Sequence, residues 1–496
     1  MGLFQDQAGT TVTVTVATLV LYLVTKAVYN VFFHPLRSFP GPISHAISRL
    51  PYCYHVLRGN SPYKYLAFHE RYGDVVRIAP DELAFSNPDA WKQIMGTHPG
   101  DDEFEKWRHF YRSISIAPVS IINGDRAEHS VLRRQLSPGF SERSLREQEP
   151  LIKQYIDLLM LRLHENCAVG SKSVDMVAWY NFTTFDIIGD LTFGRPFGSL
   201  EKSKYNPFIP MLLKSSHLCG VLFCMSFVPY LQEMTLALMP KSILKGFQRH
   251  REISIAKLNE RMRLGRERND LIEGLLGRND ELDMDVDKLE ANSTVLLIAG
   301  SETTATLLSG VTYLLLRNSD TMARLTKEVR ATFKSEDEID FISVNKLTYM
   351  LACLNEALRH YPPVPIALPR VVPKGGRHIA GHFIHEDTVV GIHHWAVYHN
   401  EKYFTDPLNF HPERFLGDKK FSKDRFDLLQ PFNVGPRNCL GKNLAYAEMR
   451  SILARMVYNF DMKLASDSVD WMEGQMVNFL WEKPPLNVYL TPVRRK

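Results

Sequence analysis

Apolar and polar residues recur along this chain mainly with the period of a helix. Residues 11–33 form one nearly unbroken apolar run, and about 20 helical residues are enough to span the hydrocarbon core of a bilayer. Helical patterns then dominate from about 128 to 359. They include a long pattern over 287–317, and a further helix is predicted over 442–458.

Two short β regions interrupt the helical patterns. The first pairs 74–78 with 83–85 through a turn at 79–82, and the second covers 368–392 with a turn at 374–376. Because the helical patterns far outweigh the strand patterns, the sequence predicts a mainly α fold, with a large helical domain and a small β-rich part.

The apolar run at 11–33 favours a membrane anchor helix within residues 1–34. A cleaved signal peptide is disfavoured, since Asp6 precedes the run and no small-residue cleavage site follows it. A helix lying in the membrane interface and a helix buried in the protein remain open. Arg37 and Arg49 follow the run, whereas no Lys or Arg precedes it, so the charge asymmetry predicts a single pass with the body in the cytosol.

Beyond the anchor, the segment 39–42 reads Phe-Pro-Gly-Pro, which is stiff and non-helical. The length of 496 residues would allow several domains. However, no internal repeat, low-complexity linker or second boundary interrupts the remaining sequence. We therefore expect one catalytic domain over residues 35–496.

Composition narrows the possible functions. The chain is 45% hydrophobic and 11% aromatic, so it can bury a large core, and disordered or low-complexity classes are excluded. The net charge of +4 is too small for a nucleic-acid-binding field, so no nucleic acid is expected as a partner. The six cysteines form no CxxC pairs and are too sparse for a disulfide framework, as expected in a reducing compartment.

The candidate chemistry is concentrated in residues 432–441, Phe-Asn-Val-Gly-Pro-Arg-Asn-Cys-Leu-Gly, which lead into a predicted helix. Gly435 and Gly441 allow close backbone approach to a flat ligand. Backbone N–H groups at the helix start should lower the pKa of the Cys439 thiol, and Arg437 can neutralise a carboxylate on the ligand. This pattern favours a thiolate ligand to haem iron over the alternative of a buried loop cysteine.

The pattern Phe-x-x-Gly-x-Arg-x-Cys-x-Gly resembles that of the cytochrome P-450 family of haem-thiolate monooxygenases. The resemblance extends from Phe39 nearly to the C-terminus. It implies the cytochrome P-450 fold and a haem b cofactor whose iron has Cys439 as its axial ligand. The cofactor-binding residues implied in this segment are Phe432, Gly435, Arg437 and Gly441.

A second motif, Glu356-Ala357-Leu358-Arg359, places a carboxylate and a guanidinium on one helix face. An exposed pair of this kind would contribute only a few tenths of a kcal/mol. In the family the pair is buried and completed by an Arg from a loop motif, which Pro412-Glu413-Arg414-Phe415 matches here. The resemblance therefore implies a structural role for Glu356, Arg359 and Arg414 behind the haem.

A third motif, Ala299-Gly300-Ser301-Glu302-Thr303-Thr304, lies inside the long predicted helix. A mid-helix Gly and an acid–hydroxyl pair reduce helix propensity, which a functional role would explain. In the family the acid and the alcohol relay protons to the dioxygen that the haem binds. Glu302 and Thr303 match these catalytic positions, and the alternative is a packed helix with one exposed Glu.

The haem carboxylates require cationic partners. His129 and Arg133 lie four residues apart on one predicted helix face. They resemble a family helix that normally carries Trp and Arg at this spacing, so His129 departs from the family pattern. Arg370 matches a strand that passes beside the haem in the family. Together with Arg437, these residues are the predicted partners of the haem propionates.

The resemblance implies a monooxygenase that inserts one oxygen atom from O2 into a lipophilic substrate, with electrons from NADPH supplied by a flavoprotein reductase. The expected location is the endoplasmic reticulum membrane. The segments Phe-Pro-Gly-Pro and Leu-Pro-Arg-Val-Val-Pro-Lys-Gly-Gly look like the fungal secondary-metabolism branch, which suggests a terpenoid, polyketide or alkaloid substrate. Apolar pocket walls are expected at 114–122, at Ala299, at 364–368 and at 476–479.

Two other functions are compatible with the haem motifs. One is a haem-thiolate isomerase or dehydratase, which needs no reductase and should lack the acid–alcohol pair. The other is a non-enzymatic, membrane-tethered haem binder, in which Glu302-Thr303 would have no purpose. The presence of that pair favours the monooxygenase.

Overall fold

The computed structural model describes residues 2–97, 103–112, 118–206, 208–228, 230–265, 268, 270–276 and 284–493; for 2–9 and 208–216 it describes the backbone alone. Within these residues, helices form most of the body and the strands form small sheets. The predicted mainly α fold with a small β-rich part is therefore confirmed.

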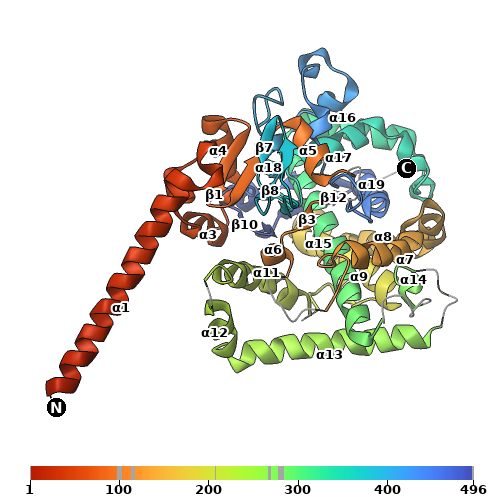
Figure 1. Ribbon diagram of the computed structural model, residues 1–496. Coiled ribbons are helices and arrows are strands. Elements are labelled where there is room, and N and C mark those ends of the chain that lie inside the picture. The colour runs from red at the N-terminus through yellow and green to blue at the C-terminus, as the bar shows by residue number, and fades with distance from the viewer. Residues whose placement is uncertain are drawn as a thin grey trace.

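The helices follow one another through the whole chain (Figure 1). The longer ones are α1 (Gly2–Val28), α4 (Ser61–Tyr72), α7 (Arg126–Leu136), α8 (Glu142–Asn166), α9 (Met176–Phe193), α11 (Phe208–Met225), α13 (Lys241–Arg263), α15 (Val286–Arg317), α16 (Ser319–Thr332), α17 (Thr348–His360) and α19 (Lys442–Asn459). The shorter ones are α2 (Ile43–Ile47), α3 (Leu50–Leu57), α5 (Pro88–Met95), α6 (Arg108–Tyr111), α10 (Ser199–Lys202), α12 (Leu231–Ala237), α14 (Glu273–Leu276) and α18 (His394–Tyr398). The helices predicted over 287–317 and 442–458 are α15 and α19, so both predictions are confirmed.

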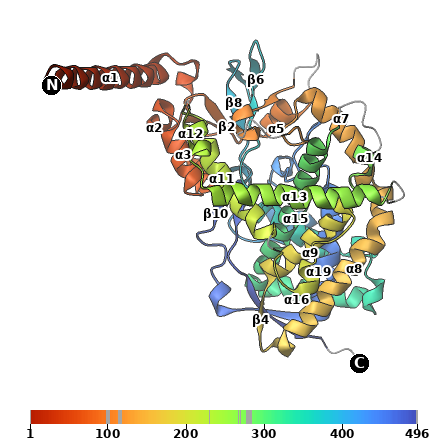
Figure 2. The ribbon, with the colours of Figure 1, turned by 90° about the horizontal axis from the view of Figure 1, so that it is seen from below.

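Helix α15 runs through the centre of the helical part (Figure 1). It begins after Asp285, whose carboxylate accepts a hydrogen bond of 2.7 Å from the Lys288 amide, and Arg317 in its last turn complements the helix dipole. Its buried leucines pack against α9, α17 and α19, and α13 crosses it on the side seen in Figure 2. This central position places one face of α15 against the segment that precedes α19.

The largest sheet holds five strands in the order β1 (Val75–Ala79), β2 (Glu82–Phe85), β8 (Val389–Gly391), β5 (Arg370–Val371) and β3 (Glu105–Lys106). The pair β2–β8 is parallel, and the other pairs are antiparallel. A three-stranded sheet holds β4 (Ser173–Asp175), β12 (Asn487–Pro492) and β9 (Phe460–Leu464), and two hairpins are formed by β6 (Arg377–Ile379) with β7 (His382–Ile384) and by β10 (Met476–Asn478) with β11 (Leu480–Glu482).

Both predicted β regions are present. In the first, Ala79 pairs with Glu82, so the turn predicted at 79–82 is confirmed, with Pro80 and Asp81 as its two central residues. In the second, Gly375 and Gly376 have positive φ and turn the chain between β5 and β6. The hairpin of β6 and β7 turns separately at 380–381.

Helix α1 projects alone from the body (Figure 1), and a π-helical turn, Tyr29–Phe33, extends it. Within Thr10–Phe33, an 18-residue window has a mean hydropathy of 1.8, and no residue of that window is buried by the protein. The alternative of a helix buried in the core is therefore wrong. At its end, however, the Asn30 side chain is buried and donates a hydrogen bond of 2.9 Å to the Ile47 carbonyl.

Candidate active site

An apolar cavity of about 340 Å³ lies between α15 and the segment that precedes α19. Helix α15 contributes one face to this cavity, because residues three and four positions apart lie on the same face of a helix. These residues are Val295, Leu296, Ala299, Gly300, Thr303, Thr304 and Leu307. The opposite wall includes Phe432, Cys439, Leu440, Gly441, Leu444 and Ala445. The structure therefore brings the third motif and the Cys439 segment to one cavity.

The Cys439 side chain is exposed into this cavity, and its backbone amide donates a hydrogen bond of 2.8 Å to the Phe432 carbonyl. Burial under the surrounding protein raises the pKa of its thiol, and the Gly441 amide and Arg133 lower that pKa by less. The expectation that the protein groups alone lower the pKa of the Cys439 thiol is thus wrong. Desolvation raises this pKa by more than the backbone amide at the helix start lowers it. A metal ion deprotonates a coordinating thiol outright.

The two glycines of the segment have different surroundings. Gly435 has φ of +77°, and an added Cβ would lie 1.8 Å from the Met95 carbonyl oxygen at the end of α5. Gly435 is therefore required for packing of the loop on α5. It is not among the described residues that line the cavity, and its approach to the ligand stays a prediction. Gly441 lines the cavity, as does Phe432.

Cationic side chains gather at one end of the cavity. His129 and Arg133 of α7 line it, and so does Arg437. Arg133 donates hydrogen bonds of 2.8 and 2.5 Å to the carbonyl and side-chain oxygens of Asn438, one residue before Cys439. Arg437 forms an ion pair with Glu103. The structure thus places three of the four predicted propionate partners at the cavity.

Arg370 differs from the other three. It is 3% exposed, it donates a hydrogen bond of 3.1 Å to the Tyr111 hydroxyl, and it is not among the described residues that line the cavity. Its direct cross-strand partner, Lys106, does line the cavity. Sequence reasoning missed Lys106, because a two-residue strand leaves no periodic signal.

The basic side chains at this end of the cavity, which are those of Lys106, His129, Arg133 and Arg437, outnumber the carboxylates that lie beside them. The pKa of Lys106 falls to about 6, first because of burial and then because of Arg437 and Arg370. The pKa of His129 falls to about 3, first because of burial and then because of the neighbouring positive charges, of which Arg437 has the largest effect. The carboxylate that raises the pKa of Lys106 is that of Glu103, which already pairs with Arg437. An anionic ligand at this end of the cavity would offset the mutual repulsion.

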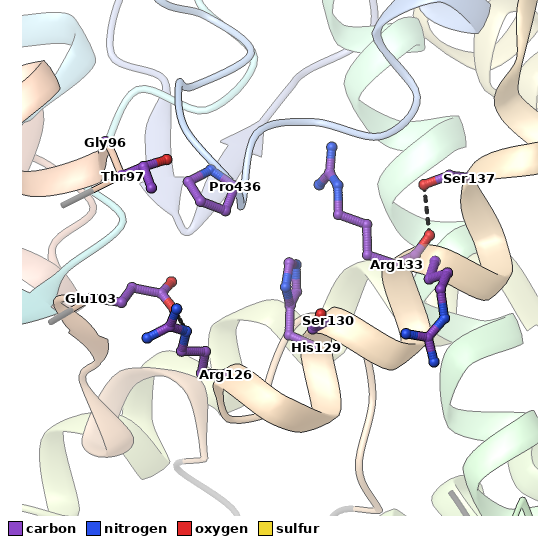
Figure 3. Close-up of a pocket in the computed structure, with 10 residues that line it drawn as sticks. Gly96, Thr97, Glu103, Arg126, His129, Ser130, Arg133, Ser137 and Pro436 are labelled. Carbon is purple, nitrogen blue, oxygen red and sulfur yellow. Dashed lines mark hydrogen bonds and ion pairs between the residues drawn. The ribbon is translucent and has the colours of Figure 1, made fainter. Parts of the chain in front are cut away.

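His129 and Arg133 also line a second cavity of about 420 Å³, here called the outer cavity, whose other walls include Glu103, Arg126 and Pro436 (Figure 3). In Figure 3 both side chains extend from α7 toward the loop that carries Pro436, and Glu103 lies beside Arg126. This outer cavity begins at the capping box of α7, in which Asp125 and Glu128 exchange side-chain and backbone hydrogen bonds.

The structure separates Glu302 from Thr303. Thr303 lines the cavity, and its hydroxyl donates a hydrogen bond of 2.7 Å to the Ala299 carbonyl. The Glu302 side chain lies on another face of α15, where its carboxylate accepts from the Lys483 ammonium. Glu302 is 3% exposed, so the alternative of an exposed Glu is wrong. Lys483 gave no signal in the sequence, since it lies 181 residues away.

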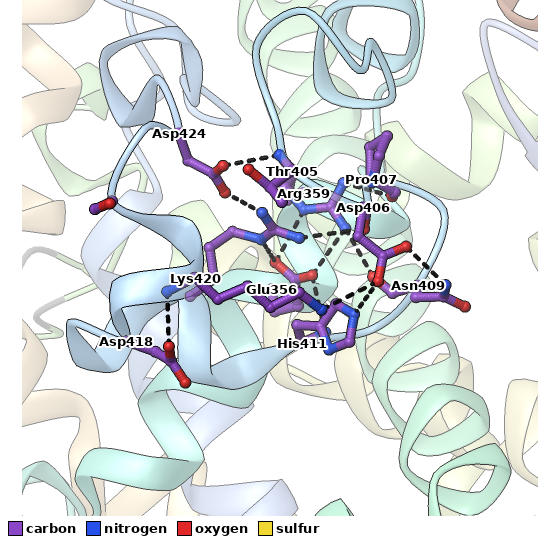
Figure 4. Close-up of polar contacts among 12 residues, drawn as sticks. Glu356, Arg359, Thr405, Asp406, Pro407, Asn409, His411, Asp418, Lys420 and Asp424 are labelled. Atoms are coloured by element: carbon purple, nitrogen blue, oxygen red, sulfur yellow. Dashed lines mark hydrogen bonds and ion pairs between the residues drawn. The ribbon is translucent and has the colours of Figure 1, made fainter.

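The second motif forms a buried network behind the site (Figure 4). Glu356 accepts hydrogen bonds of 2.9 and 2.8 Å from Arg359 and one of 3.1 Å from Arg414, and all three side chains are 0% exposed. Arg359 also donates to the Tyr398 and Pro407 carbonyls, at 2.9 and 2.8 Å. Asp424, which sequence reasoning missed, pairs with Arg414.

The expected pocket walls are found only in part. Ile121, Ile122, Ala299, Val364 and Leu368 line the cavity, whereas 114–117 lie outside the described residues. Residues 476–479 line neighbouring hollows instead. An unpredicted member of the wall is Glu448 of α19, whose two carboxylate oxygens are buried without a hydrogen-bond partner. Burial raises the pKa of Glu448 to about 8.

Comparisons with known proteins agree with this geometry. The family model for cytochrome P450 matches residues 45–490. The chain is 47% identical to the cytochrome P450 monooxygenase tpeC of Talaromyces stipitatus over 486 residues. This alignment covers 97% of this chain and 95% of that protein. It is 46% identical to the cytochrome P450 monooxygenase prhB of Penicillium brasilianum, with 96% of this chain and 97% of that protein covered. It is 44% identical to the trichothecene C-15 hydroxylase of Fusarium sporotrichioides, with 95% and 96% covered.

Proposed function

Because this chain belongs to the cytochrome P450 family, whose relatives above are haem-dependent monooxygenases, we propose that it inserts one oxygen atom from O2 into a lipophilic small molecule with electrons from an NADPH-dependent flavoprotein reductase. The observation that carries this proposal is the cavity itself. Cys439 and the Thr303 face of α15 line opposite walls of one apolar space with a cationic end.

The residues present fit a haem. Cys439 offers a sulfur ligand, Phe432 and Gly441 offer an apolar wall, and the cationic end has unbalanced positive charge suited to two carboxylates. In our proposal Arg133, Arg437, His129 and Lys106 hold the haem propionates. Arg370 acts behind them, through Tyr111. The haem would supply O2 binding and O–O cleavage, which the thiolate favours by donating electron density.

The protein groups control substrate and protons. The apolar wall excludes water and holds a lipophilic substrate over the Cys439 side. Thr303 presents a hydroxyl to the cavity. Glu302 is the acid that replaces the proton given up by the Thr303 hydroxyl. The buried network of Glu356, Arg359 and Arg414 holds the segment that leads to Cys439 in one conformation. None of the three side chains contacts the reacting atoms.

We propose residues 1–34 as a membrane anchor and 35–496 as the catalytic domain, in the endoplasmic reticulum membrane with the body in the cytosol. The exposed apolar helix α1 supports this placement. Arg134, Lys442 and Lys420 are exposed and suit an acidic flavoprotein surface. If Arg134→Glu and Lys442→Glu leave the rate of reduction unchanged, that docking surface is wrong.

For the substrate we propose a terpenoid skeleton, supported by the resemblance to a trichothecene hydroxylase and by the apolar cavity. The test is co-expression with a reductase in a host fed terpenoid precursors under ¹⁸O2. A product heavier by one labelled oxygen supports the proposal. A rearranged or dehydrated product without added oxygen would support the isomerase or dehydratase, and haem binding without any product would support the non-enzymatic binder.

The acid–alcohol pair is tested with Thr303→Ala and Glu302→Gln. Positioned acid–base groups contribute about 10²–10⁴-fold to such proton transfers. Product per NADPH should fall in both variants, and the reducing equivalents should appear as hydrogen peroxide. Ser301→Ala is the matched control, because Ser301 back-bonds to Leu297 as Thr303 does to Ala299, but is buried away from the cavity. Unchanged coupling in both test variants would refute the pair.

A further inference from the structure

A separate cavity of about 590 Å³ lies on the side of α15 opposite to Thr303. Ile298 and Glu302 contribute to it from α15, whereas Ala299, Gly300, Thr303 and Thr304 contribute to the haem cavity. Its other walls come from α9 and from the C-terminal strands. These include Asn181, Tyr205, Gln475, Trp481 and Lys483. Helix α15 therefore forms the partition between two cavities.

The Glu302 carboxylate belongs to this rear cavity. Its Oε1 atom pairs with the Lys483 ammonium, and Lys483 also donates a hydrogen bond of 2.7 Å to the Thr306 hydroxyl. The two side chains of the pair are only 3% and 4% exposed. The other oxygen, Oε2, is buried and has no hydrogen-bond partner among the residues that the structure describes.

An ionised oxygen without a partner is costly to bury, so such atoms are usually bonded to ordered water. The rear cavity has room for water, and the polar groups of Asn181 and Tyr205 also line it. Its rim includes Glu473 and Gly474, which are exposed to solvent. Water from the surface can thus reach the Glu302 carboxylate without passing through the apolar haem cavity.

We propose that the rear cavity is the proton-uptake path of this enzyme, and that Lys483 is the positioning residue that holds the Glu302 carboxylate in it. This proposal rests on the proposed function of Glu302 and Thr303. Rear-cavity water that has taken up a proton from bulk solvent transfers it to Glu302: the O–H bond of the protonated water breaks, an O–H bond forms on Glu302, and the neutral acid loses its charge attraction to Lys483. The acid then turns to the Thr303 side, gives that proton to the Thr303 hydroxyl oxygen as the hydroxyl passes its own proton into the haem cavity, and returns as a carboxylate to Lys483.

The position of Lys483 has a chemical consequence. The Lys483 ammonium is the cation that pairs with this buried carboxylate, and a buried carboxylate requires such a partner. Without that cation, the carboxylate has no fixed orientation toward the water. Lys483 therefore acts through Glu302 and touches neither the substrate nor the haem.

Two changes test this path. Lys483→Met removes the cation, and Ile298→Trp fills the rear cavity from a position that does not line the haem cavity. Both variants should keep the carbon monoxide spectrum and substrate binding of the parent. Product per NADPH should fall about tenfold or more, hydrogen peroxide should rise, and the solvent deuterium isotope effect on product formation should increase. Lys463→Met, an exposed lysine on β9, is the matched control and should change none of these.

A double-mutant cycle separates positioning from general damage to the fold. If Lys483 acts through Glu302, the variant with both Lys483→Met and Glu302→Gln should be no worse than Glu302→Gln alone. Lys483→Arg keeps the cation and should restore most of the coupling and the parent pH profile. Losses that multiply in the double variant would overturn the positioning role. If Lys483→Met does not fold, Lys483→Arg and Ile298→Trp still decide the question.

The outcomes also distinguish this inference from the proposed function. Unchanged coupling in Glu302→Gln and Thr303→Ala refutes the acid–alcohol pair itself. If those variants lose coupling but Lys483→Met and Ile298→Trp do not, the pair stands and the rear path is wrong.

Discussion

Lys106 and Arg370 are direct partners across the ladder between β3 and β5, so two basic side chains lie opposite each other at this end of the sheet. Lys106 donates hydrogen bonds of 3.1 and 2.6 Å to the Ile121 and Ile122 carbonyls, and Arg370 donates to Tyr111. Like charges directly opposite one another destabilise a sheet. An anion that shares this space would offset the repulsion and favour the charged form of Lys106, whose pKa falls to about 6 without one.

Lys106→Met should therefore weaken haem retention rather than the fold. A hydrogen bond to a charged group contributes about 1.5–3 kcal/mol, which corresponds to about 10–100-fold faster haem loss. The rate of haem transfer to apomyoglobin measures this effect. Lys92→Met, an exposed lysine on α5, is the control. An unchanged rate of haem loss would remove Lys106 from the propionate partners.

The axial ligand has a spectroscopic test. The reduced protein with carbon monoxide should show the strongly red-shifted Soret band of thiolate ligation. Cys439→Ser should abolish that band, because Cys439 is the cysteine that faces the cavity. Cys353→Ser, at a buried cysteine of α17, should leave the band in place. Retention of the band in Cys439→Ser would overturn the assignment.

The buried network of Glu356, Arg359 and Arg414 should dominate the stability of the region. Glu356→Gln leaves two buried guanidinium groups without their shared carboxylate, and breaking such a network costs about 3–5 kcal/mol. Urea unfolding of the holoenzyme gives the difference. Arg143→Leu breaks the exposed pair with Glu147 and should cost at most about 1 kcal/mol. Equal losses in the two variants would contradict the structural role.

Glu448 should make stability depend on pH. Its pKa is about 8 in the folded protein, well above that of an unfolded glutamate, so the folded state holds the extra proton between about pH 4.5 and pH 8. This contribution to stability is present below about pH 4.5 and is lost as the pH rises through 8. Glu448→Gln cannot ionise, so its Tm relative to the parent should rise from pH 5 to pH 8. A constant difference in Tm would show that Glu448 has a partner or water that keeps it ionised.

Asn30, which lies inside the predicted anchor, also contacts the body. Asn30 is buried, and its carbonyl accepts a hydrogen bond of 2.9 Å from Arg77. Deletion of residues 2–27 should weaken membrane association in a flotation assay and leave haem incorporation intact. Deletion of 2–34 should also lower the Tm, because it removes the contacts of Asn30. Equal Tm values for the two truncations would place the boundary at 34, as the sequence predicts.

The sequence predicted features that depend on local spacing. Helices α15 and α19 follow from hydrophobic periodicity. The spacing of Glu356 and Arg359 predicts only a pair on one helix face, and the buried network with Arg414 followed from the family resemblance. The direction of Glu302 did not follow from its motif. Adjacent helical residues point about 100° apart, so the motif alone does not tell which of Glu302 and Thr303 faces the cavity.

Long-range partners gave no signal at all. Lys106 meets Arg370 across a two-residue ladder, and Lys483 reaches Glu302 from the far end of the chain. The raised pKa of the Cys439 thiol also depends on how much protein surrounds it, which spacing does not reveal. Such properties arise from tertiary packing, whereas periodicity reports only which face of an element is covered.

The contact between Gly300 and Ile188 has a consequence for attempts to reshape this enzyme. An added Cβ at position 300 would lie 2.8 Å from the Ile188 Cδ1 atom, and both residues line the haem cavity. A mutant library that varies position 300 by itself should return glycine most often, because any larger residue requires the Ile188 side chain to shift. When position 188 is randomised together with it, alanine or serine at 300 becomes accessible beside valine or alanine at 188. A cavity shaped for a new substrate therefore requires paired substitutions, in which side-chain volume is removed at position 188 of α9 and added at position 300 of α15.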